Sequence, residues 1–271
     1  MIDAVTRTEA LLRRERLIII AGLAIIIALA WTYIISGGGT AMTAVSMTHW
    51  RLPLSMAMHA APATWTLTYA LVMVTMWWTM MIAMMLPSAA PTVLLYAQVT
   101  RHAARQGQVN ATVPAAVFVA GYLAVWLAFS ILATGLEWLL ERAGVIDGMM
   151  MGSVDAWLSG GLLIAAGLYQ LSPLKGVCLD HCRAPAVYLS QHWRAGRSGA
   201  FLMGIGHGAY CLGCCWALML LLFVGGVMNL LWIAGLTAVV LLEKLSPFGS
   251  RLAPWLGSGF LLGGTLVILL V

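Results

Sequence analysis

A succession of long apolar runs constrains this chain more than any other feature of its sequence. Each run is about as long as the 20 or so residues that an α-helix needs to cross a bilayer. The runs predict an all-α fold: a polytopic transmembrane helical bundle of about seven spans. The predicted spans are residues 17–36, 64–86, 113–138, 154–171, 199–224, 229–245 and 253–271.

The composition supports a membrane protein over a soluble one. Hydrophobic residues make up 62% of the 271 residues and charged residues only 8%, whereas soluble domains average about 25% charged residues. A soluble fold of this length exposes too much surface to hide that many apolar side chains. No long polar linker divides residues 1–271, which we therefore treat as a single integral membrane domain. No basic patch interleaved with aromatics indicates a nucleic-acid partner.

The distribution of lysine and arginine predicts how the chain lies in the bilayer. If the N-terminus is cytoplasmic, the inner side collects all but two of the 14 Lys and Arg residues. The outer side then carries only Arg51 and Arg142. Cytoplasmic loops are enriched in these cations, so we expect the N-terminus inside and the C-terminus outside. On this topology residues 172–198 form the longest inner loop.

A methionine-rich segment, MVTMWWTMMIAMMLPSAAP, occupies the second predicted span. One helical face is shared by Met73, Met76, Met80 and Met84. Thioether sulfur is a soft, uncharged ligand suited to copper(I), although methionine is also an adaptable packing residue. Pro87 and Pro91 follow at once, and they either open the helix near its inner end or only shape the bundle.

Two further motifs carry all five cysteines of the chain. In KGVCLDHCRAP, Cys178 and Cys182 are four residues apart, so on a helix they share a face. This spacing occurs in structural zinc sites, but a single pair needs ligands from elsewhere. The two thiols could equally have no role.

The motif GIGHGAYCLGCCWALM lies inside the fifth predicted span. His207, Cys211 and either Cys214 or Cys215 recur at helical spacing and can face one groove of the bundle. Imidazole and thiolate together are good ligands for zinc or copper(I). The alternative is a histidine bonded to a carbonyl beside three cysteines that pack as small hydrophobic residues.

Small residues four apart allow helices to approach closely in lipid. The pairs Gly204 with Gly208 and Gly259 with Gly263 are therefore predicted packing sites. Glu243 lies beside Lys244 near the inner end of the sixth predicted span, where the two could form a local ion pair. Acidic residues are too few in the spans to predict a path for hard cations or a proton relay.

The three motifs resemble a bacterial family described as predicted metal-binding integral membrane proteins, a domain of unknown function. The resemblance covers the chain from about Met73 to the C-terminus, and its matching segments are MMIAMMLPSAAP, YQLSPLKGVCLDHCRAP, GHGAYCLGCCWALM and GGVMNLLWIAGLTAVVLLEK. The resemblance implies a multi-pass protein of the bacterial inner (plasma) membrane. The metal ligands that it implies are Cys178, Cys182, His207, Cys211, Cys214 and Cys215, with the methionines as further candidates.

These patterns favour a soft-metal-binding membrane protein, with copper(I) the first candidate and zinc the second. It would act as a transporter or as a chaperone-like subunit that serves a membrane or cytoplasmic metal-handling partner. Metal binding is favoured over catalysis, and enzymatic activity stays open. The alternatives are a membrane thiol oxidoreductase that uses the cysteine pairs, a non-catalytic subunit of a larger complex, and a haem or quinone protein that uses scattered histidines such as His49 and His59.

Overall fold

The computed structural model describes residues 2–40, 43–48, 64–105, 113–148 and 151–270 of the chain. Within these residues every regular element is a helix, which confirms the predicted all-α class, and the only strand-like feature is an isolated bridge between Ile146 and Ser153. The helices are α1 (Ile2–Ile35), α2 (Leu67–Arg105), α3 (Ala115–Arg142), α4 (Ala156–Gln170), α5 (Pro173–Arg183), α6 (Pro185–Gln191), α7 (Gly196–Leu220), α8 (Leu222–Gly225), α9 (Leu230–Leu245) and α10 (Gly249–Leu269).

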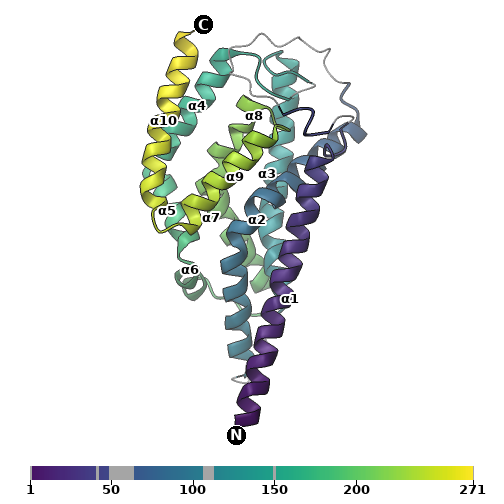
Figure 1. The fold of residues 1–271 in the computed structure, drawn as a ribbon, viewed down its shortest axis with the longest axis vertical. Coiled ribbons are helices and arrows are strands. Elements are labelled where there is room, and N and C mark those ends of the chain that lie inside the picture. Colours follow the sequence, from purple (N-terminus) through teal and green to yellow (C-terminus); the bar gives the residue numbers. More distant parts are fainter. Residues whose placement is uncertain (1, 41–42, 49–63, 106–112, 149–150, 271) are drawn as a thin grey trace.

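The bundle is built from a few adjacent helix pairs. Figure 1 shows α1 running along α2, and α10 lying against α4 at the opposite edge of the molecule. Between them α3 packs on α7, while α9 crosses in front and contacts α2. The core therefore lies where α2, α3, α7 and α9 meet.

Helix α2 continues through both of its prolines. It runs for 39 residues and contains Pro87 and Pro91 in its interior. The predicted span ended at Leu86 because a proline removes a helical hydrogen bond. In the structure Ser88 Oγ and Tyr122 Oη donate to the Met85 carbonyl at 2.8 and 3.1 Å. Of the two possibilities for these prolines, the structure does not show the opened helix.

Glycines bring the backbones of α3 and α7 together. A Cβ atom on Gly204 would lie 2.0 Å from the Phe118 carbonyl oxygen, and one on Gly121 would lie 2.1 Å from the Phe201 carbonyl oxygen. A Cβ on Gly208 would meet Val125. The predicted packing role of the 204 and 208 pair is therefore confirmed, because no other residue leaves this room.

The packing role predicted for Gly259 and Gly263 is wrong. A Cβ on Gly259 or Gly263 would meet nothing within 4 Å. The contact of α10 with α4 is instead made by Gly257 and Gly264, whose added Cβ atoms would approach the carbonyl oxygens of Gly167 and Gly160. These glycines are seven residues apart, which is two helical turns, so spacing alone did not identify the buried face.

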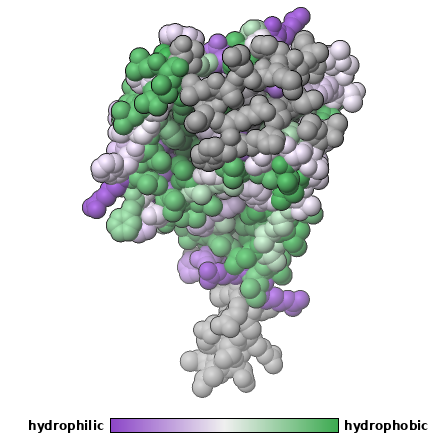
Figure 2. Space-filling view, turned by 45° about the horizontal axis from the view of Figure 1, so that its top comes forward, coloured by the Kyte–Doolittle hydropathy of each residue, from purple (hydrophilic) through white to green (hydrophobic). Residues whose placement is uncertain are grey.

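The described helices account for part of the predicted span count. Five are long and apolar enough to cross a membrane, and a sixth span would result if α4 and α5 act together despite the 65° bend between them. Helix α9 has 16 residues, which is about 24 Å of helix and shorter than a typical bilayer core. Seven spans and their orientation therefore remain predictions. Figure 2 shows hydrophobic side chains over much of the described part of one face.

The segment expected to be the longest inner loop is largely helical and packs on the bundle. Ser172 caps α5 by accepting from Lys175 N at 3.3 Å, and Pro173 supplies a preset first residue. Helix α5 lies against α7, and α6 follows it. The sequence predicts this segment only as a connection between spans, and the structure adds that most of it forms α5 and α6.

Two lysines that were counted as loop charges are buried. Lys175 is 1% exposed and Lys244 is 6% exposed. Lys175 Nζ lies 2.6 Å from Glu243 Oε2, and Gln170 Nε2 donates to Glu243 Oε1 at 2.8 Å. Lys175 Nζ also donates to Gln170 Oε1. Glu243 therefore pairs with Lys175 of α5, and the local ion pair with Lys244 proposed from the sequence is not formed.

Candidate metal centre

Four of the five cysteines gather where α5 meets α7. Cys214 Sγ lies 3.9 Å from Cys182 Sγ and 3.3 Å from Cys215 Sγ. Cys211 is close enough to interact with both Cys182 and Cys215. The three cysteines of α7 are each 1% exposed. We refer to Cys182, Cys211, Cys214 and Cys215 as the thiol cluster.

The sulfur spacing of the thiol cluster suits a shared soft ion. Two thiolates that bind one ion at about 2.3 Å with tetrahedral angles are about 3.8 Å apart. The Cys182–Cys214 distance of 3.9 Å matches this spacing, and the Cys214–Cys215 distance of 3.3 Å is somewhat shorter. Among the described residues no three His, Cys, Asp or Glu side chains already surround one point as ligands. Binding would therefore require small side-chain rotations.

Cys211 has two polar neighbours at the edge of the thiol cluster. Lys244 Nζ, from the last turn of α9, lies 2.8 Å from Cys211 Sγ. Tyr122 Oη, from α3, lies 3.0 Å from the same sulfur. Lys244 Nζ also lies 3.4 Å from Ser88 Oγ of α2. The thiol cluster is thus bordered by a buried ammonium group, a phenol and a hydroxyl from three further helices.

Cys178 lies one helical turn before Cys182 and contacts a different part of α7. A Cβ atom on Gly213 would lie 2.7 Å from Cys178 Sγ. The two α5 cysteines therefore both face α7, as their spacing predicts. Cys178 is half-buried, and it lies at the surface side of the thiol cluster, where Tyr169 Oη donates to the Gly213 carbonyl.

His207 lies among aromatic rings one turn from Cys211. Its ring is 5.4 Å from that of Tyr188, 5.8 Å from Tyr122 and 6.0 Å from Phe118. His207 is 2% exposed, and within the described residues its Nδ1 atom has no hydrogen-bond partner. The alternative of a histidine held by a carbonyl at Nδ1 is therefore not what the structure shows. A buried imidazole with a free nitrogen is available as a further ligand.

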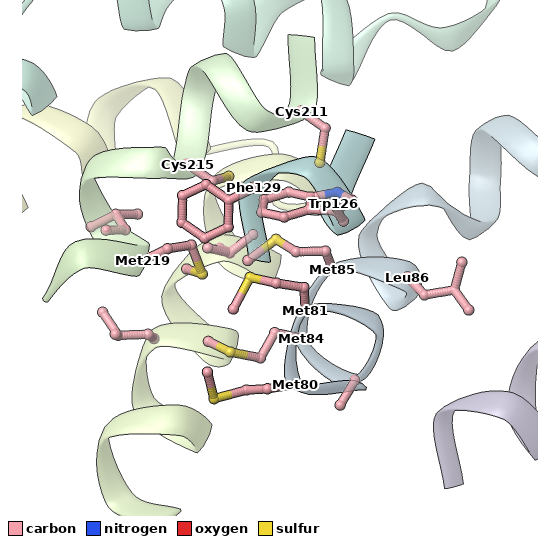
Figure 3. Close-up of a cluster of buried hydrophobic side chains, with 14 of the residues drawn as sticks. Met80, Met81, Met84, Met85, Leu86, Trp126, Phe129, Cys211, Cys215 and Met219 are labelled. Atoms are coloured by element: carbon pink, nitrogen blue, oxygen red, sulfur yellow. The ribbon is translucent and has the colours of Figure 1, made fainter. Parts of the chain in front are cut away.

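A group of methionines continues from the thiol cluster into the core. Figure 3 shows Met80, Met81, Met84 and Met85 pointing from α2 into a space that Met219 of α7 also enters, with Cys211 and Cys215 at one end. All five methionines are fully buried. Met76 is buried farther along α2, where an added Cβ on Gly38 would contact both Met76 and Met228. We call Met76, Met80, Met81, Met84, Met85 and Met219 the thioether row.

Some of these residues were not expected from the sequence. Lys244 was treated as a loop cation or as the partner of Glu243, and Tyr122 and Met219 were not considered. Lys244 lies at the end of an apolar helix of 16 residues and follows Glu243 directly. The sequence therefore does not indicate which way its side chain points. In the structure Glu243 pairs with Lys175, and Lys244 contacts Cys211 instead. The histidines considered for a haem, His49 and His59, lie outside the described residues.

Comparison with known proteins gives one match. No curated protein and no solved structure matches the chain. A family model named PpoB2 and described as a copper chaperone matches residues 74–267. The matched range contains the thiol cluster, the thioether row and Lys244, and it covers well over half of the chain. The chain therefore belongs to the PpoB2 copper chaperone family.

Proposed function

We propose that the protein is an integral membrane copper chaperone that holds copper(I) at the thiol cluster and passes it to a partner protein. The observation that carries this proposal is the approach of Cys182 of α5 to the buried cysteines of α7, with Sγ atoms 3.9 Å apart. Three sulfurs on one helix could be packing residues. A fourth from another helix, at a spacing suited to a shared ion, favours a ligand set.

The chemistry of the surroundings favours a soft monovalent ion. Thiolate and thioether ligands select copper(I), whereas hard ions require oxygen ligands. Three of the buried carboxylates already have partners: Glu137 accepts from Trp77 Nε1, Glu141 accepts from Trp65 Nε1, and Glu243 pairs with Lys175. Zinc is the second candidate because it also binds thiolate and imidazole. The family description agrees with copper.

The thioether row supplies a route by which the ion could leave or reach the thiol cluster. Neutral sulfur atoms bind copper(I) without adding charge to a region of low dielectric. Figure 3 places Met85 and Met81 nearest to Cys211 and Cys215, with Met84 and Met80 farther along α2. Exchange from one sulfur to the next is the movement we propose, with the partner receiving the ion at one end.

The membrane placement belongs to the same proposal. Apolar side chains such as Leu132, Leu262 and Trp255 are 72%, 72% and 80% exposed on long helices, and lipid would cover them. We propose that the chain lies in a bacterial inner membrane with its N-terminus in the cytoplasm. The acceptor is then a membrane or cytoplasmic metal-handling protein. Cysteine accessibility to a membrane-impermeant reagent from each side tests this orientation.

Metal content of purified variants tests the copper site. We expect the wild-type protein, loaded with copper under reducing conditions and desalted, to retain the ion, and Cys182→Ser and Cys214→Ser to retain much less. Each substitution removes one thiolate while leaving the helix contacts in place. The matched control is Met203→Leu, which changes a buried sulfur-containing residue of α7 outside the thiol cluster. Elemental analysis gives the metal-to-protein ratio.

Two results would contradict the proposal. Equal copper retention in both serine variants and the wild type would remove the thiol cluster as the site. Reversible disulfide formation by these cysteines in cells, detected by rapid thiol trapping and mass spectrometry without copper retention, would support the thiol oxidoreductase instead. The observation that favours this second function is the short distance between Cys182 and Cys214, because disulfide exchange requires two thiols in reach of each other.

A further inference from the structure

Lys244 is a buried cation whose neighbours are the ligand candidates themselves. Its Nζ atom is 2.8 Å from Cys211 Sγ, and all four thiols of the cluster are close enough to interact with its charge. Tyr122 and His207 are the other titratable groups that feel this charge. An ammonium group in this position is part of the electrostatics of any metal bound there.

The carboxylate that would ordinarily neutralise Lys244 is engaged elsewhere. Glu243, its neighbour in the chain, has both oxygens within 2.8 Å of Lys175 Nζ and accepts from Gln170. The hydrogen bonds that the structure gives to Lys244 Nζ are to a thiol and to the Ser88 hydroxyl. A buried charge is strongly unfavourable unless an opposite charge is close. The opposite charge available to Lys244 is therefore thiolate.

The charge of Lys244 acts differently on monovalent and divalent ions. One copper(I) ion held by two thiolates has a net charge of −1, which a single ammonium group cancels. A zinc ion beside the same ammonium group needs three thiolates for neutrality, so one more thiol must lose its proton in a buried site. The direct repulsion between Lys244 and the bound ion is also twice as large for a divalent ion.

We propose that Lys244 is a specificity-determining residue: its fixed positive charge neutralises a copper(I) dithiolate in the thiol cluster and disfavours divalent ions. This inference rests on the proposed function, because it assumes that the thiol cluster binds copper. It assigns to Lys244 a role in choosing the ion rather than in binding it, since an ammonium group has no lone pair to offer.

A competition experiment tests the role of Lys244. The purified full-length protein, stripped of metal, is offered equal concentrations of copper(I) and zinc(II) under reducing conditions, and bound metals are measured after desalting. We expect the wild type and Lys244→Arg to retain mainly copper. We expect the copper-to-zinc ratio to fall in Lys244→Met by on the order of tenfold, since removing a nearby charge is worth at least that factor at a buried site.

The controls separate this inference from simpler explanations. Lys244→Gln, which keeps a polar side chain, decides the question if Lys244→Met does not fold. The double variant Lys175→Met with Glu243→Gln removes another buried lysine without changing net charge, and its metal ratio should equal that of the wild type. Equal ratios in the wild type and both neutral Lys244 variants would overturn the inference, even if total metal falls. A wild type that retains neither metal would instead overturn the proposed function.

Discussion

Two buried lysines at neighbouring places in the fold have very different partners. Lys175 of α5 lies against the carboxylate of Glu243 and the amide of Gln170. Lys244 of α9 lies against the sulfur of Cys211 and, less closely, the hydroxyl of Ser88. Both are nearly inaccessible to solvent. Yet one ammonium group is matched by a carboxylate, while the other faces the thiols that we propose as metal ligands.

The difference shows how to tell a structural buried charge from a functional one. Lys175, Glu243 and Gln170 satisfy each other and join α4, α5 and α9, so they require nothing more from the molecule. Lys244 has no such closed set of partners among those described, and under the proposed function its environment would change when a cation enters. Burial alone does not distinguish the two lysines; the chemistry of the partner does.

Lys175→Met should be the most damaging single change. It leaves Glu243 buried without its cation, which costs about 3–5 kcal/mol of unfolding free energy for a buried pair. Chemical unfolding of the purified protein in detergent measures the loss. Because Lys175 lies outside the thiol cluster, the folded fraction should still bind copper at the wild-type ratio.

The matched control for this change is the double variant Lys175→Met with Glu243→Gln. Removing both charges avoids the uncompensated carboxylate, so most of the lost stability should return. A double variant as unstable as the single one would mean that packing, and not the charge, accounts for the effect. Lys175 would then no longer serve as the structural half of the comparison.

Lys244→Met should cost less stability, about 1–3 kcal/mol. The change leaves a thiol and a hydroxyl without one hydrogen bond, but no carboxylate without its cation. The same unfolding measurement in the absence of metal gives the value. A loss as large as that of Lys175→Met would show that Lys244 has a mainly structural role, which would break the contrast drawn above.

Ser88→Ala should have the smallest effect. The Ser88 hydroxyl is 3.4 Å from Lys244 Nζ, a long hydrogen bond, and it donates to the Met85 carbonyl at 2.8 Å. We expect a loss of about 0.5–1 kcal/mol and no change in the copper-to-zinc ratio. A changed ratio in this variant would mean that the hydroxyl helps to hold the ammonium group in place, which would move Ser88 to the functional side of the comparison.

Much of the fold could be predicted from the sequence because bilayer-length apolar runs have few alternatives. The helical class and the approximate positions of α1, α2, α3, α7 and α10 follow from those runs. The exact ends do not, since α2 continues through Pro87 and Pro91 as far as Arg105. The position of α5 beside α9 could not be predicted either, because it involves the buried Lys175–Glu243 pair, which joins residues 68 positions apart.

The candidate site was predictable to the extent that its ligands lie on one helix. The spacing of Cys211, Cys214 and Cys215 places them together on α7 without any knowledge of the rest of the fold. Spacing could not show that Cys182 joins them while Cys178 contacts Gly213 instead. That choice depends on how α5 lies on α7, which is set by contacts between distant parts of the chain.

The backbone contact between α3 and α7 has a mechanical consequence for the thiol cluster. With Gly204 and Gly121 each leaving no room for a methyl group, α3 and α7 are packed backbone to backbone at these positions. The three sulfur atoms of α7 therefore lie on a helix that is packed closely against α3. If the thiol cluster binds and releases an ion as proposed, we expect the side chain of Cys182 to make the larger adjustment, because it lies on a short helix whose 11 residues begin at a sharp bend.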